Sequence, residues 1–268
     1  MKNKVVIVTG ASSGIGKALV MELMSMNAKV VMASRNKAML DEIISNVTIN
    51  HEYILAIETD VTNEEDCKRL IEATINKYGK IDVLINNAGI SMRALFDEVS
   101  IDVIKKVMDV NFWGTVYCTK YALPHILKSK GSVVGVSSIA GYKGLPGRTG
   151  YSASKFAMQG FLEVLRIENI KKGLHVLIAC PGFTASNIRK VALSKDGSQQ
   201  GETPLDESKL MSAEEVSKKI VNAIIKRKNS VIMTSQGKMT VLLNKFFPKL
   251  VDKLVYNHMA KEPDSPFK

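Results

Sequence analysis

The chain has 268 residues, 46% of them hydrophobic, which is enough to bury a full core and fits one large domain better than two small ones. Its formal net charge is +11, but residues 218–268 hold eleven Lys or Arg against three Asp or Glu and so carry eight of those charges. Because the body is nearly neutral, the composition argues against nucleic-acid binding. The basic tail indicates either an anionic surface or partner, or merely solubility.

The N-terminus and the cysteine and histidine content bear on location and metal chemistry. Residues 1–4 lead straight into the apolar run 5–8, which leaves no room for a secretory signal, so we expect a cytoplasmic protein. The four histidines show no metal-ligand spacing, and we expect no bound metal. The cysteines form no CxxC pair and lie in apolar stretches, so we expect buried thiols rather than disulfides at Cys67, Cys118 and Cys180.

Apolar runs of strand length alternate with segments of helical periodicity along the chain. Strands that read as continuous apolar runs are buried on both faces, which is typical of a parallel sheet covered by helices on both sides. We therefore predict a single α/β domain with a doubly wound parallel sheet, whose ligands bind beyond the carboxyl ends of the strands. The predicted strands are 5–8, 29–33, 53–57, 83–85, 132–136 and 176–179, and the predicted helices include 17–26, 64–77, 101–127 and 151–172.

One stretch, residues 194–208, does not look like core. It is rich in Gly, Ser, Gln, Asp and Pro and lies between an apolar strand and the next helix. We interpret it as a mobile loop over the site. A loop of this length is usually either a functional lid or simply disordered, and the sequence leaves both open.

A glycine-rich turn directly follows the first predicted strand and precedes a helix. This arrangement aims free backbone N–H groups and the positive end of a helix dipole at a phosphate. The spacing is not that of a P-loop, because Lys17 is followed by Ala18 rather than by Ser or Thr, so nucleotide hydrolysis is disfavoured. The cofactor contacts predicted in this turn are Gly10, Ser12, Ser13, Gly14, Ile15 and Gly16.

The end of the second strand indicates which nicotinamide cofactor is bound. About twenty residues after such a turn, an NAD site places an Asp or Glu on the ribose 2′-hydroxyl. This chain has Ser34, Arg35 and Asn36 there. A carboxylate would repel the extra phosphate of NADP, whereas a guanidinium pairs with it, so we predict NADP(H). The alternative interpretation is that Arg35 is an ordinary solvated loop residue.

Taken with this turn, four further segments resemble the short-chain dehydrogenase/reductase family over roughly residues 1–235. Their occurrence together and in order is far more specific than a lone glycine motif. The resemblance implies a Rossmann fold and an oxidoreductase. The segments are Asn86-Asn87-Ala88-Gly89, Asn111, Ser137-Ser138 and Tyr151-Ser152-Ala153-Ser154-Lys155.

The resemblance also implies four catalytic residues. Tyr151 would give its phenolic proton to the carbonyl oxygen as hydride arrives, or take it back in the reverse direction. Lys155, one helical turn later, would favour the phenolate and could also hydrogen-bond the nicotinamide ribose. Ser138 would hold the reacting oxygen. Asn111 would complete a proton relay through bound water, although by itself it reads as a plain helix-interior amide.

Further cofactor contacts follow from the same resemblance. The family often has a threonine four residues after the glycine of its Pro-Gly pair, where this chain has Ser186, with Thr184 two residues earlier, so which hydroxyl meets the carboxamide stays open. Some NADP-dependent relatives also carry a basic residue at the position of Ser13, so the predicted preference depends mainly on Arg35. The implied contacts are Asp60 and Val61 at the adenine, Asn87, Ala88 and Gly89 at the adenosine ribose, and Pro181, Gly182 and Thr184 beside the nicotinamide.

The C-terminal part, residues 236–268, looks like the ending of lipid- and steroid-handling reductases in this family. Lysines interleave with Leu, Phe and Val, so a helix here could rest its apolar side on a membrane surface, but the charges leave no run long enough to span one. The alternative is a helix packed over the substrate mouth of its own or a neighbouring subunit. We treat residues 1–235 as the domain and 236–268 as a basic amphipathic extension on or near that mouth.

Together these features predict an NADP(H)-dependent oxidoreductase that transfers hydride between nicotinamide and the carbonyl or hydroxyl carbon of a small, apolar, lipid- or steroid-like substrate. A non-catalytic NADP(H)-sensing or interaction protein on the same fold is the alternative. A nucleotide-sugar epimerase fits less well, because such relatives usually carry a longer C-terminal domain. We expect a homodimer or homotetramer, with helices 101–127 and 151–172 as candidate contact surfaces, and no nucleic-acid partner.

Overall fold

A seven-stranded, all-parallel sheet with the strand order β3-β2-β1-β4-β5-β6-β7 forms the centre of the protein. This computed structural model describes residues 1–47, 51–202, 210–262 and 265. The predicted doubly wound α/β fold is confirmed. The strands are β1 (Val5–Thr9), β2 (Lys29–Ser34), β3 (Ile54–Glu58), β4 (Val83–Asn86), β5 (Ser132–Val136), β6 (His175–Cys180) and β7 (Ser230–Ile232).

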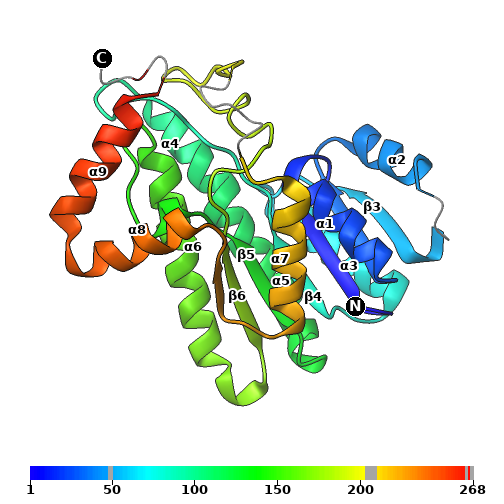
Figure 1. Ribbon diagram of the computed structural model, residues 1–268. Coiled ribbons are helices and arrows are strands. Elements are labelled where there is room, and N and C mark those ends of the chain that lie inside the picture. Colours follow the sequence, from blue (N-terminus) through cyan, green and yellow to red (C-terminus); the bar gives the residue numbers. More distant parts are fainter. Residues whose placement is uncertain (48–50, 203–209, 263–264, 266–268) are drawn as a thin grey trace.

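Helices cover both faces of the sheet. Successive strand residues point to opposite sides, so apolar side chains on both faces are buried under helices. Val6 and Val8 pack with one set of helices, while Val5 and Ile7 pack with the other. In Figure 1, α1 and α7 lie next to each other over one face. The first set is α1 (Gly14–Ser25), α2 (Lys37–Ser45) and α7 (Ala213–Ile225), and the second is α3 (Glu64–Tyr78), α5 (Gly114–Lys128) and α6 (Thr149–Glu168).

Two predicted helices differ from the structure. The helix expected over 101–127 consists of α4 (Ile101–Met108), a π-helical turn η2 (Asp109–Trp113) and α5. The helix expected over 151–172 is α6, which begins at Thr149 and ends at Glu168, followed by the short 3-10 helix η4 (Ile170–Lys172). Periodicity could not show the π turn, since it inserts only a local change of register that tertiary contacts stabilise.

Two other short 3-10 helices flank the strands. Tyr53, predicted to start the third strand, instead ends η1 (His51–Tyr53), and η3 (Ile139–Gly141) follows β5. The three cysteines are buried and free, as expected.

The segment predicted as a mobile loop, 194–208, is described only as far as residue 202. Leu193 bridges Met92 and also Gln199, and the N–H of Ser194 donates to the carbonyl of Ser198, so this part folds into a hydrogen-bonded turn. Residues 203–208 lie outside the described residues. In Figure 1 this yellow part of the chain lies above the upper ends of the strands.

The C-terminal extension forms two helices, α8 (Ser235–Phe246) and α9 (Pro248–Ala260), which pack against the segment that follows β5. Asn244 donates to the carbonyl of Tyr142, and Lys143 pairs with Asp252. A cavity of about 490 Å³ lies between α9 and residues 143–146, and the catalytic candidates do not line it. Within the described chain, no helix is long and apolar enough to cross a membrane.

Candidate active site

The glycine turn between β1 and α1 is built so that backbone rather than side chains faces the ligand. Gly10 and Gly14 have φ of +64° and +51°, which L residues rarely adopt. A Cβ on Gly16 would lie 2.0 Å from the carbonyl oxygen of Gly10. Ser13 precedes α1 without capping it by a side-chain hydrogen bond, so the first N–H groups of the helix are not engaged by that side chain. The turn therefore fits a pyrophosphate.

Thr9 and Asn87 join this turn to the end of β4. The hydroxyl oxygen of Thr9 accepts from the backbone N–H groups of Asn87 and Ala88, both at 3.0 Å. The side-chain amide of Asn87 donates to the carbonyl of Thr9 at 2.9 Å. The Asn87 side chain, predicted to line the adenosine ribose, therefore also holds the turn in shape. Thr9 was missed because its role depends on a contact 78 residues away in the chain.

The residues predicted at the adenosine end lie around the carboxyl end of β2. The hydroxyl of Ser34 donates to that of Ser12 at 2.9 Å and so links this end to the glycine turn. Arg35 is exposed and makes no ion pair with any residue that the structure describes. Asn36 caps α2 by accepting from the N–H of Met39, so its side chain serves the helix.

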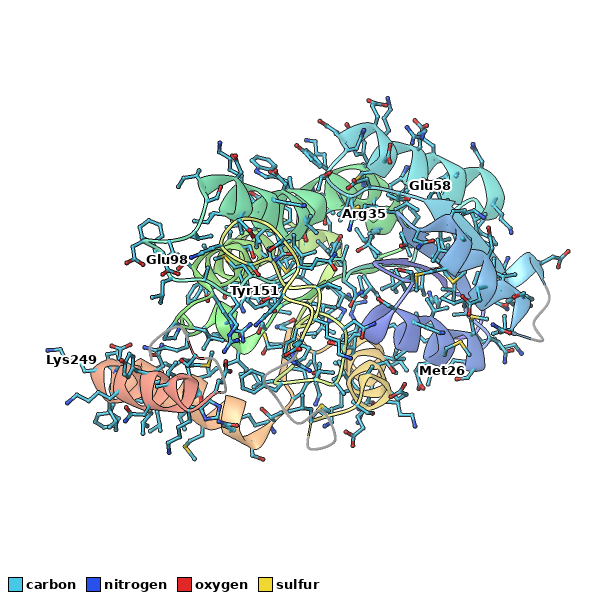
Figure 2. The ribbon with its side chains drawn as sticks, turned by 90° about the horizontal axis from the view of Figure 1, so that it is seen from above. Met26, Arg35, Glu58, Glu98, Tyr151 and Lys249 are labelled. Atoms are coloured by element: carbon cyan, nitrogen blue, oxygen red, sulfur yellow. The ribbon has the colours of Figure 1, made fainter. Side chains whose placement is uncertain are left out.

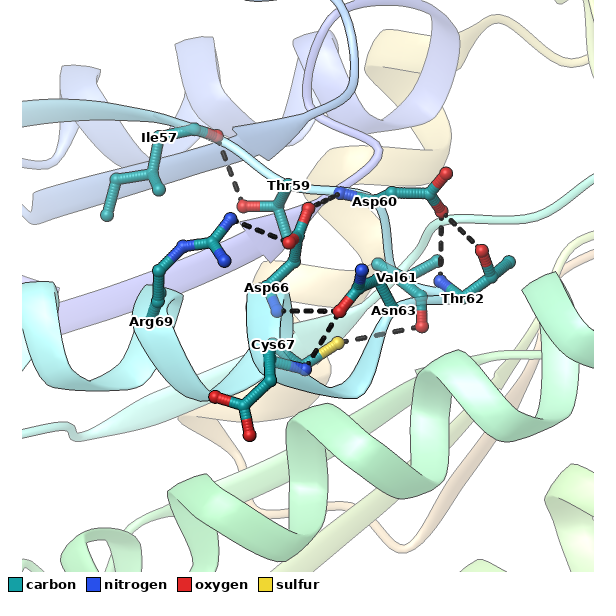
Figure 3. A network of polar contacts seen from close by, with 10 residues as sticks. Ile57, Thr59, Asp60, Val61, Thr62, Asn63, Asp66, Cys67 and Arg69 are labelled. Atoms are coloured by element: carbon teal, nitrogen blue, oxygen red, sulfur yellow. Dashed lines mark hydrogen bonds and ion pairs between the residues drawn. The ribbon is translucent and has the colours of Figure 1, made fainter.

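A polar network fixes the turn predicted to meet the adenine (Figure 3). The carboxylate of Asp60 accepts from the N–H and the hydroxyl of Thr62, at 2.9 and 2.8 Å. The N–H of Asp60 donates to Asp66, which also pairs with Arg69 at 2.6 Å. Val61, next in the chain, is buried against Gly114, where a Cβ would lie 2.8 Å from Val61. Asp60 and Val61 thus have fixed positions in the turn after β3, next to the end of β2.

Tyr151 and Lys155 lie on the first two turns of α6, and Ser138 lies just after β5. The Lys155 ammonium donates to the carbonyl of Val136 at 2.9 Å and lies 5.7 Å from the centre of the Tyr151 ring. Seen from the carboxyl ends of the strands, Tyr151 lies between Arg35 and Lys249 (Figure 2). The structure therefore brings the three predicted residues Ser138, Tyr151 and Lys155 together.

Burial and nearby polar groups shift the pKa values of Tyr151 and Lys155. Burial raises the pKa of the Tyr151 phenol, while the hydrogen-bonding Ser138 hydroxyl and the positive charge of Arg148 act to lower this pKa. Burial lowers the pKa of Lys155 to about 8. A lysine with this pKa is largely charged at neutral pH, so it stabilises a negative phenolate beside it.

Asn111 lies in the π turn and is completely buried. Its side-chain oxygen accepts from the N–H of Ile90 at 2.8 Å, and its amide donates to the carbonyl of Ile90 and to Ser154 at 3.0 and 2.9 Å. The side chain therefore connects the segment after β4 to α6 next to Lys155. Asn111 therefore has a specific structural role, and the predicted proton relay stays a prediction.

The segment after β6 contains the last predicted cofactor contacts. Pro181 is buried, and a Cβ on Gly182 would lie 2.7 Å from Thr234. Thr184 is buried and donates to the carbonyl of Gly182 at 3.1 Å. Ser186, in contrast, lies 3.4 Å from where a Cβ on Gly14 would stand, so it faces the glycine turn.

Comparisons with known proteins agree with this geometry. The sequence profile described as short chain dehydrogenase matches residues 4–197, and the chain belongs to the short-chain dehydrogenase/reductase family. It is therefore an oxidoreductase of the class that acts on CH–OH groups with a nicotinamide cofactor, NAD or NADP.

Individual relatives add detail. The chain is 34% identical over 276 residues to 11-beta-hydroxysteroid dehydrogenase A of Arachis hypogaea, covering 98% of this chain and 78% of the relative. It is 32% identical to dehydrogenase/reductase SDR family member 7B of Mus musculus, covering 99% and 84%. A Burkholderia phymatum family member solved in complex with NAD has the same fold, with a TM-score of 0.82, 24% identity and coverage of 93% and 95%.

Proposed function

We propose that this protein is an NADP(H)-dependent oxidoreductase that interconverts a hydroxyl and a carbonyl group on a small, apolar, lipid- or steroid-like molecule. The observation that carries the proposal is the placement of Tyr151, Lys155 and Ser138 together at the carboxyl edge of the sheet, beside a turn that fits a pyrophosphate. The substrate class is supported by the names of the steroid dehydrogenases to which the chain is similar.

When bound, the nicotinamide would supply or accept the hydride. Tyr151 would transfer the proton at the substrate oxygen, since a half-buried phenol on α6 can donate it as the carbonyl is reduced. Lys155 would stabilise the phenolate form of Tyr151 through its positive charge. Its hydrogen bond to the carbonyl of Val136 holds that charge in place. Ser138 would orient the substrate oxygen toward the phenol.

The NADP preference is supported by Arg35. Its guanidinium is exposed, and in the described chain no carboxylate is paired with it, so it can meet an added ribose phosphate. The link between Ser34 and Ser12 holds the adjoining backbone against the glycine turn.

The test follows NADPH absorbance while steroid, retinoid, long-chain acyl and small ketones are offered. Oxidation of NADPH by an apolar ketone, lost in Tyr151→Phe, supports the proposal. Tight NADPH binding with no turnover across the panel would favour the alternative, a non-catalytic NADP(H)-sensing protein.

We also propose that the protein is a homodimer or homotetramer that assembles through α5 and α6. Large apolar side chains are exposed on α6, on η4 and at Trp113 directly before α5, Ile170 being 72% exposed. Clustered exposed apolar side chains of this kind usually mark an interface. Light scattering after size exclusion should give a multimer that Ile167→Glu dissociates, while Ile225→Glu on α7 leaves the mass unchanged.

A peripheral membrane contact through α8 and α9 is a separate proposal. The exposed apolar residues Leu242 and Phe246 lie on α8 with the exposed Lys245, and the exposed Phe247 lies between α8 and α9, two residues before the exposed Lys249. Apolar and basic groups together suit the surface of an anionic bilayer. Vesicles with anionic lipid should retain the protein at low salt, and a Phe246→Ser/Phe247→Ser variant should lose this retention. Equal retention of both proteins would contradict the contact.

A further inference from the structure

Three arginines, two of them buried and Arg93 nearly so, come from separate segments at the carboxyl edge of the sheet. Arg93 follows β4, Arg148 immediately precedes α6, and Arg189 follows β6. Glu262, just after α9, is buried beside two of them. Nothing in the sequence pattern marks these residues, because they are far apart in the chain.

Glu262 pairs with two of the arginines. One carboxylate oxygen lies 3.3 Å from Arg93 and the other lies 3.9 Å from Arg148. Only 6% of Arg148 and 5% of Glu262 is exposed. Taking charged groups out of water is costly, and a buried ion pair is weak evidence for stability. The placement of this pair therefore invites a functional explanation.

The position of Arg148 close to Tyr151 in the chain suggests a function for this ion pair. Arg148 is the N-cap residue of α6, its carbonyl accepts from the N–H of Ser152 at 2.8 Å, and Tyr151 lies three residues further on. Arg148 therefore lies directly before the helical turn that carries Tyr151. Burial lowers the pKa of Arg148 and raises the pKa of Tyr151, and the charges of the two groups act against both shifts.

We propose that Arg148 is a positioning residue for the proton step: its guanidinium, held by Glu262 from the C-terminal segment, acts electrostatically on the phenol of Tyr151. The inference rests on the proposed function only in taking Tyr151 as the proton-transferring group. The consequence is that docking of the C-terminal segment and the acidity of the phenol are connected through one buried ion pair.

Other groups also face this phenol and are left unchanged in the test. Lys155 lies on the same helix, Ser138 lies after β5, and the Cys180 thiol lies at the end of β6. Arg93 and Arg189 in turn face Arg148, and their charges act to lower its pKa. Substitution of Arg148 or Glu262 therefore changes one charge in an otherwise constant field.

The experiment is a spectrophotometric titration of tyrosinate in the protein without substrate or cofactor. Each variant is made with Tyr151 and with Tyr151→Phe, so that the difference spectrum reports Tyr151 alone. Arg148→Gln should raise the midpoint by about one pH unit, because it removes a nearby positive charge. Glu262→Gln should lower the midpoint, because it removes a negative charge and keeps the size of the side chain. Arg148→Lys should restore most of the original value.

The controls separate an electrostatic role from a structural one. Arg166→Gln removes a guanidinium from the other end of α6, where it pairs with Glu163, and should leave the midpoint unchanged. Unchanged midpoints in Arg148→Gln and Glu262→Gln, or shifts of the same sign, would overturn the proposal. Where Arg148→Gln does not fold, Glu262→Gln decides: a midpoint that fails to fall overturns it. Because no turnover is measured, this result is independent of whether the substrate class is correct.

Discussion

The ammonium of Lys155 lies 5.7 Å from the centre of the Tyr151 ring and is anchored by a 2.9 Å hydrogen bond to the carbonyl of Val136. The backbone of β5 thus fixes the charge beside the phenol before any cofactor binds. Lys155 contacts the backbone, whereas Tyr151 points its hydroxyl toward Ser138. Substitutions of the two residues should therefore have different effects.

Tyr151→Phe keeps the aromatic ring and removes the proton donor. We expect turnover to fall by about 10²–10⁴-fold or more, as is typical for loss of general acid–base catalysis, with NADPH affinity nearly unchanged. Steady-state kinetics and a binding titration measure the two quantities. Tyr117→Phe on α5 is the matched control and should keep its activity. Near-normal turnover in Tyr151→Phe would mean that another group transfers the proton.

Lys155→Met should change the pH dependence of stability. Burial lowers the pKa of Lys155 to about 8, whereas a lysine in an unfolded chain has a pKa of about 10.4. Below pH 8 the folded protein bears the full cost of a buried charge. Between these pKa values the unfolded chain binds more protons, so stability rises with pH.

This cost is on the order of 3 kcal/mol at most. Denaturant titrations at several pH values should therefore show the wild type gaining stability relative to Lys155→Met as the pH rises from 8 toward 10. A difference that stays constant over this range would contradict a depressed pKa. The exposed Lys245→Met variant should follow the wild type throughout.

Arg35→Asp should reverse or erase the preference for NADPH. The substitution replaces a group that can pair with the 2′-phosphate by one that repels it and that suits a ribose hydroxyl. We expect NADPH affinity to fall by at least about tenfold, since a hydrogen bond to a charged group contributes about 1.5–3 kcal/mol. Fluorescence titration with NADPH and NADH measures this, with Lys106→Asp on α4 as the control. Equal affinities of the unmodified protein for the two cofactors would rule out the preference.

Local sequence patterns predicted six of the seven strands and the glycine turn, because these depend on neighbours in the chain, but they did not predict the short β7. The predicted strand 132–136 has the same bounds as β5, and all five of its residues are buried. The contacts of Thr9 with Asn87 and of Arg148 with Glu262 join residues 78 and more positions apart, and no local pattern encodes them. Likewise, the π turn at Asn111 depends on its hydrogen bonds to Ile90, which only the folded chain brings near.

Gly16→Ala should damage the cofactor site more than any other single methyl addition in the turn. The new Cβ would lie 2.0 Å from the carbonyl oxygen of Gly10 and 2.7 Å from the side-chain amide of Asn87, so the backbone must move. Because Asn87 is bonded to Thr9 and to Gly10, this movement would disturb the link between β1 and β4 as well as the pyrophosphate turn.

We expect Gly16→Ala to lose about 1–3 kcal/mol of stability, the usual cost of overpacking. We also expect it to lose more cofactor affinity than an equally destabilising substitution elsewhere in the protein would. Calorimetry with and without NADPH separates the two effects. Gly144→Ala is the matched control, because no atom lies within 4 Å of its added Cβ and its backbone is not left-handed. It should leave both stability and NADPH binding close to the wild type. Native NADPH affinity in Gly16→Ala would show that the turn tolerates side chains, and the pyrophosphate would then have to bind elsewhere.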